Sequence, residues 1–108
     1  MTTKAERELD QLAAETPELE RRAARAARAK NILEDEMFKN AVRAVRDELV
    51  KNLTSGKPEK IGEVRLMYDG LEKIVQALHT HMSDGTLARF RLEEIKSRKS
   101  FLERLRAA

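Results

Sequence analysis

Apolar residues recur every three or four positions over most of the chain, which is the spacing of one face of an α-helix. The clearest run alternates these spacings over three heptads and is typical of a coiled-coil seam. Leu71 lies at its centre, so we expect Leu71 to be buried. The members of this run are Ile61, Val64, Tyr68, Leu71, Val75, Leu78 and Met82.

A second apolar stripe precedes this run, and together the two predict an antiparallel helical hairpin. Gly56 is expected to close the first helix in the left-handed conformation, and Pro58 to start the second. Because the connection is short, the two striped helices should fold back on each other. The stripe of the first helix comprises Phe38, Val42, Val45, Leu49 and Leu53.

The ends of the hairpin are set by turn and capping residues. Asn31 followed by Glu34 resembles a capping box, which favours a new helix directly after Asn31. An unbroken helix through this point is the alternative. Ser83-Asp84-Gly85 is expected to end the second helix. The hairpin therefore pairs residues 32–54 with residues 58–83.

The segments that flank the hairpin have different compositions. The start is acidic and poor in apolar residues, so we expect it to be flexible. Thr16-Pro17 favours a helix start. The resulting all-α organisation is a flexible N-terminus (1–16), an Ala/Arg-rich helix (17–30), a coiled-coil-like hairpin core (31–84) and a basic C-terminal helix (85–108).

Both flanking helices have an apolar side. Leu19, Ala23, Ala26 and Ala27 share one side of the Ala/Arg-rich helix, where small side chains let a partner helix approach closely. In the C-terminal helix a broad apolar arc comprises Leu87, Phe90, Ile95, Phe101, Leu102 and Leu105.

The composition limits how large a core the chain can bury. Of the 108 residues, 38% are charged and 4% are aromatic, so the core should be thin. The chain has no cysteine, and hence no disulfide. It has no apolar run near the roughly 20 residues of a membrane span. We expect a soluble protein in the cytoplasm, with no membrane contact.

Two clusters contain residue types that could carry chemistry, and neither has a favourable geometry. His79 and His81 are two positions apart, so on a helix they point about 200° away from each other. The consecutive carboxylates of Glu34, Asp35 and Glu36 diverge and suit a helix start instead. We therefore expect no metal, no cofactor, no small-molecule substrate and no enzymatic activity.

Basic residues gather in two places, and their role has three interpretations. They are a solvated helix face, a site for an acidic protein surface, or a site for phosphates. No aromatic residues alternate with the arginines of residues 21–30, and no helix-turn-helix is evident, so any nucleic-acid contact there would be with the backbone and largely independent of sequence. The residues are Arg21, Arg25 and Arg28 in the first cluster and Lys96, Arg98 and Lys99 in the second.

Residues 31–91 resemble a known group of proteins. The stretches NILEDEMFKNAVRAVRDELV and GEVRLMYDGLEKIVQALHTHMSDGTLAR are similar to small helical proteins of tailed bacteriophages, encoded among head and DNA-packaging genes. The resemblance implies a role in virion assembly or packaging, and it identifies no functional residues.

The apolar surfaces exceed what a single hairpin can cover, so self-association should bury the remainder. Met67 and Ile74 beside the main seam belong to this surplus. The leading hypothesis is a structural protein of phage head assembly that acts as a homo-oligomer and binds other phage structural proteins. The alternatives are a packaging accessory that binds the nucleic-acid backbone, and a small adaptor or inhibitor of a host protein.

Overall fold

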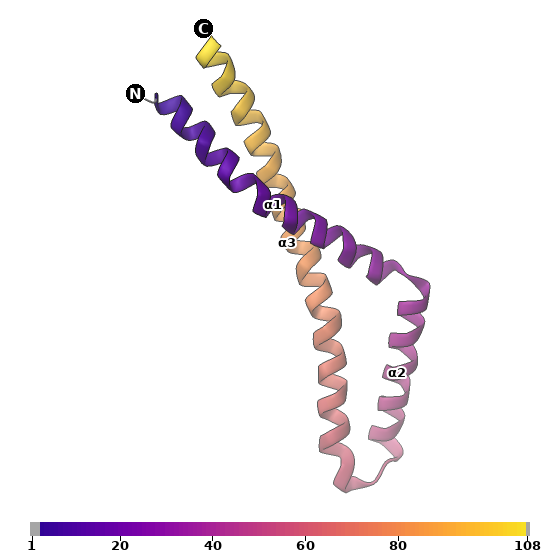
Figure 1. Ribbon diagram of the computed structural model, residues 1–108. Helices are drawn as coiled ribbons and strands as arrows, with labels where there is room; N and C mark the ends of the chain where they lie inside the picture. Colours follow the sequence, from indigo (N-terminus) through magenta and orange to yellow (C-terminus); the bar gives the residue numbers. More distant parts are fainter. Residues whose placement is uncertain (1–2, 108) are drawn as a thin grey trace. The chain divides into compact units, whose positions relative to one another are not determined.

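The computed structural model describes residues 3–107, and this part of the chain is helical almost throughout (Figure 1). The prediction of an all-α fold is confirmed. The helices are α1 (Lys4–Glu34), α2 (Glu36–Ser55), the short 3-10 helix η1 (Pro58–Lys60) and α3 (Ile61–Ala107).

The helices form two compact units, and α1 and α3 each contribute to both. The hairpin unit comprises residues 28–80. The terminal unit combines residues 3–27 with residues 81–107, so it joins the two ends of the chain.

In the hairpin unit, α2 and the first part of α3 form the predicted antiparallel hairpin (Figure 1). The side chains of Arg46 and Glu72 connect them, with 2.8 Å between Arg46 Nε and Glu72 Oε1. The prediction of a helix start directly after Asn31 is wrong, because α1 continues to Glu34. The break lies at Asp35, whose carboxylate accepts a hydrogen bond from the Phe38 amide and caps α2.

The connection between α2 and α3 differs from the prediction at one residue. Gly56 is extended, with φ of −81° and ψ of 172°, so it is not left-handed as predicted. Its amide still donates to the Asn52 carbonyl and closes α2. Pro58 is the first residue of η1, which leads into α3.

The predicted seam of the hairpin is only partly covered. Leu49 is its one buried member, while Val45 and Ile61 are exposed. Leu71 is half-buried, which corrects the expectation of a buried position. In the hairpin, α2 and the first part of α3 leave the edges of the seam in contact with water. The half-buried members are Phe38, Val42, Leu53, Val64, Tyr68, Leu71, Val75, Leu78 and Met82.

In the terminal unit, α1 begins thirteen residues before the predicted helix start at Pro17. Thr3 Oγ1 accepts a hydrogen bond from the Glu6 amide, and Glu6 Oε2 accepts one from the Thr3 amide. This capping box was missed in the sequence. The expected flexible N-terminus is therefore wrong for residues 4–16, which are helical; residues 1–2 lie outside the described part.

The helix persists through Pro17 because it packs against α3 over its whole length in the terminal unit. On each helix, the residues that face the other helix are seven positions apart, which is the repeat of a coiled coil. Tertiary packing of this kind outweighs the lost hydrogen bond at Pro17. The core cluster consists of Leu12 and Leu19 from α1 and Ala88, Ile95 and Leu102 from α3.

Gly85 lies inside α3, so the predicted helix end at Ser83-Asp84-Gly85 is wrong. Gly85 is buried, and a methyl group added there would overlap the Cβ atom of Ala26. The missing side chain therefore lets α1 and α3 approach closely. A glycine costs a helix roughly 1 kcal/mol relative to alanine, and the contact with Ala26 compensates for it. The predicted close approach to the alanine side of α1 is confirmed at Ala26.

Candidate interaction surface on helix α3

Part of the predicted C-terminal arc remains uncovered in the terminal unit. We call this part the apolar stripe. At 100° per residue its members lie within an arc of about 60°, roughly 100° away from the buried Ala88, Ile95 and Leu102. The stripe consists of Leu87 (65% exposed), Phe90 (67%), Phe101 (45%) and Leu105 (54%).

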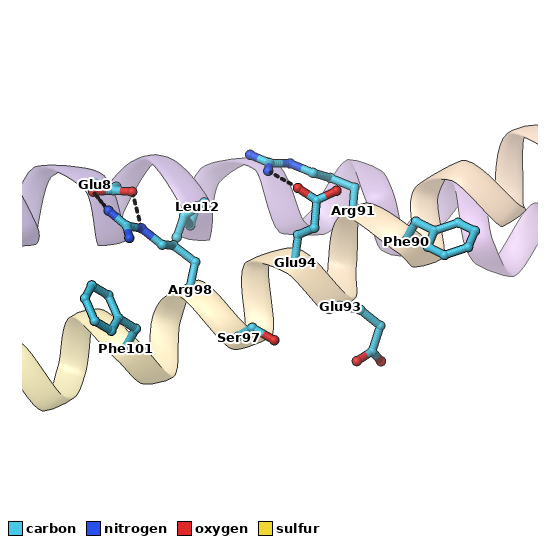
Figure 2. Close-up of a pocket in the computed structure, with 9 residues that line it drawn as sticks. All are labelled: Glu8, Leu12, Phe90, Arg91, Glu93, Glu94, Ser97, Arg98 and Phe101. Carbon is cyan, nitrogen blue, oxygen red and sulfur yellow. Dashed lines mark hydrogen bonds and ion pairs between the residues drawn. The ribbon is translucent and has the colours of Figure 1, made fainter.

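A shallow hollow lies between the two aromatic side chains of the stripe. In Figure 2, Phe90 and Phe101 stand at its two ends, with Ser97 between them along α3. Leu12 of α1 contributes to its floor. The polar side chains around it belong to Glu8, Arg91, Glu93, Glu94, Ser97 and Arg98.

Three ion pairs between α1 and α3 border the stripe on one side, at intervals of seven residues. In each, an arginine donates two hydrogen bonds to one carboxylate, the geometry that gives such pairs their specificity. The distances are 2.7 and 3.0 Å for Arg98 with Glu8, 2.7 and 2.8 Å for Arg91 with Glu15, and 2.9 and 2.6 Å for Arg22 with Asp84.

These pairs determine which residue of α1 faces which residue of α3. The charge order reverses at the third pair, where α1 supplies the arginine. A shift of one helix by seven residues would therefore place Glu15 near Asp84, which repels. Hydrogen bonds from the arginines hold the pKa values of Glu8, Glu15 and Asp84 below their usual range.

The structure distributes the predicted basic residues over different environments. Arg21 is paired with Glu18 on its own helix, at 2.7 Å. Arg25 and Arg28 are exposed. In the second cluster, Lys96 is exposed, Lys99 is half-buried and the guanidinium of Arg98 is occupied by Glu8. The second cluster is therefore not a single cationic site.

Arg98 also lies over the ring of Phe101, with its Cζ atom 5.2 Å from the ring centre. This is within the range of a cation–π contact. From its neighbours in the sequence, Arg98 is expected to act with Lys96 and Lys99 as a binding residue. Its spacing of seven from Arg91, and the matching spacing of Glu8 and Glu15, was the signal that could have assigned it to an interhelical pair.

Groups that could carry chemistry are scattered. His79 is exposed and His81 is half-buried. Within residues 3–107, no three His, Cys, Asp or Glu side chains are placed to hold a metal ion. None of the helices in this part is long and apolar enough to cross a membrane.

The chain was compared with protein-family models, with curated proteins and with solved structures, and none of them matches.

Proposed function

We propose that this chain is a non-enzymatic assembly protein that works by binding further copies of itself through its helices. The observation that supports the proposal is the balance between covered and uncovered apolar side chains. The buried set is small and includes three alanines, whereas many large side chains stay exposed. The buried hydrophobic residues are Leu12, Leu19, Ala26, Ala29, Leu49, Ala88, Ile95 and Leu102.

Exposed apolar side chains occur in both units. This favours a role in assembly, because a single exposed patch could be accidental. In the hairpin unit, Met67 and Ile74 lie seven residues apart on one face of α3, beside the seam that faces α2. In the terminal unit the apolar stripe covers a separate face. Exposed apolar side chains that gather on one face of a helix are typical of interaction sites.

The biological setting of the proposal rests on the resemblance of residues 31–91 to small proteins of tailed bacteriophages. On that basis the assembly would belong to phage head formation, in the cytoplasm of the host and in the virion. Other phage structural proteins would then be partners as well.

A second candidate function is binding to a nucleic-acid backbone during packaging. The observation in its favour is that Arg25 and Arg28 are both exposed and that neither forms a salt bridge with any described residue. Phosphate contacts by arginine would weaken steeply with salt.

Light scattering on a size-exclusion column tests the proposal at micromolar concentrations of chain. We expect a mass of at least twice the 12.4 kDa of one chain. This mass should depend little on salt, because the buried surface is apolar. A constant mass of one chain would reject self-assembly and favour the adaptor hypothesis. Duplex DNA added to the same samples tests the second candidate. Steeply salt-dependent binding that is lost when Arg25 and Arg28 are replaced by Gln would support it.

A further inference from the structure

The apolar stripe of α3 is nearly symmetric along the helix. Leu87 and Leu105 lie nine positions on either side of Lys96, and Phe90 and Phe101 lie six before it and five after it. Lys96 itself points roughly 150° away from the stripe. A surface with this symmetry can pair with an identical copy that runs in the opposite direction, since each residue then meets its counterpart of the same kind.

Two charged residues lie between the apolar members of the stripe. They have the same symmetry along the helix, and their charges are opposite. Glu94 and Arg98 lie two positions on either side of Lys96. In an antiparallel pair, Glu94 of each copy would face Arg98 of the other. A parallel pair would place Glu94 against Glu94 and Arg98 against Arg98, and like charges in such positions repel.

Arg98 and Glu94 each have a hydrogen-bonding atom left for a partner copy. Arg98 uses Nε and Nη2 for Glu8, and Glu94 uses Oε2 for Arg91. The remaining Nη1 of Arg98 and Oε1 of Glu94 make no hydrogen bond to any described residue. An intermolecular pair would therefore extend the existing ion pairs instead of breaking them.

The hollow between Phe90 and Phe101 provides the matching shape. Ser97, a small side chain, lies between the two rings (Figure 2). A facing helix can insert side chains between the rings, as knobs enter holes in a coiled coil. Phe90 of one copy would then lie beside Phe101 of the other, and aromatic pairs of this kind add to the gain from burial.

We infer that two copies of this chain pair through the apolar stripe, with their α3 helices antiparallel about a twofold axis near Lys96. The inference rests on the proposed self-assembly and specifies one interface and one orientation. It brings together Leu87 with Leu105, Phe90 with Phe101, and Glu94 with Arg98 of the opposite copy.

Cysteine cross-linking tests the orientation, because the chain has no cysteine of its own. Ser97→Cys lies close to the proposed axis, so mild oxidation should link two copies to each other. Leu87→Cys should not link to itself, since its two copies would be about 27 Å apart along the helix. An equimolar mixture of Leu87→Cys and Leu105→Cys should form the mixed dimer.

The outcomes separate this inference from the proposed function. Self-linking of Leu87→Cys would indicate a parallel pair and overturn the antiparallel arrangement. If light scattering gives a dimer but Ser97→Cys fails to link, the inference is wrong while self-assembly stands. If the parent protein has the mass of a single chain, both this inference and the proposed self-assembly are wrong.

Loss of the interface gives an independent test. The double variant Phe90→Ser, Phe101→Ser alters exposed side chains, so its helical content should equal that of the parent. Its mass should fall to that of one chain at concentrations where the parent is dimeric. The matched control is Met67→Ser, Ile74→Ser in the hairpin unit, which should stay dimeric. A dimer that persists in the first variant and is lost in the control would place the interface on the hairpin unit instead.

Discussion

The terminal unit and the hairpin unit are both pairs of antiparallel helices, yet they are packed differently. The stronger apolar pattern belongs to the hairpin, whose seam has larger side chains. The tighter packing belongs to the terminal unit, where Ile95 is 3% exposed and Ala88 is fully covered. In the hairpin seam only Leu49 is buried, at 8%.

The difference comes from the small residues. Where Gly85 meets Ala26, the two helix backbones come close, and the neighbouring Ala88 is fully covered. Interhelical distance depends on the side chains at the contact. In the hairpin unit, Gly70 is also inside α3, but no atom beyond its own stretch of helix backbone lies within 4 Å of the position a Cβ would take. A glycine that contacts another helix and one that does not therefore have different roles in the same helix.

Truncation of a large core residue should show the greatest contrast between the units. Ile95→Ala removes a buried side chain, and we expect a loss of about 2–5 kcal/mol in the free energy of unfolding. Leu71→Ala removes a half-buried one, so the loss should be nearer to about 1 kcal/mol. Urea titration followed by circular dichroism measures both. Equal losses would show that the hairpin seam is as well covered as the terminal core.

Adding one methyl group to each glycine should change stability in opposite directions. Gly85→Ala forces α1 and α3 apart, and overpacking of this kind costs about 1–3 kcal/mol. Gly70→Ala meets open space and should stabilise the helix by about 1 kcal/mol. Thermal unfolding of the two variants beside the parent is a direct measurement. A stabilising Gly85→Ala would mean that the close contact with Ala26 does not exist.

Acid should weaken the terminal unit, and we expect this effect to be the smallest because the ion pairs are partly exposed. Arginines lower the pKa values of Glu8, Glu15 and Asp84 in the folded state. These groups therefore contribute stability above the unfolded pKa of about 4, and it is lost as pH falls through the lowered values. The melting temperature at pH 7 and at pH 3 measures the loss.

The control for this prediction replaces Glu8 and Glu15 with Gln and Asp84 with Asn. This variant should melt at a lower temperature than the parent at pH 7 and should lose less on acidification. An equal drop in both proteins would assign the acid sensitivity to other carboxylates.

Much of the hairpin could be predicted because its signals are local. The apolar spacing of α2 and α3 and the position of Pro58 all concern residues near one another in the chain. The terminal unit was largely missed, because it depends on contact between residues more than sixty positions apart. Gly85 and Pro17 are locally helix-breaking residues, and only the facing helix explains why neither ends one.

By itself the sequence determined the all-α class, the hairpin and the faces on which apolar residues lie, because helical periodicity is a property of each segment alone. The tertiary structure decided where α1 and α3 begin and end, which residues of the C-terminal arc are buried and which form the apolar stripe. It also decided that Arg98 forms an ion pair with Glu8. Those outcomes depend on which helix approaches which, and the free energy of packing between distant segments outweighs the local preferences of the residues involved.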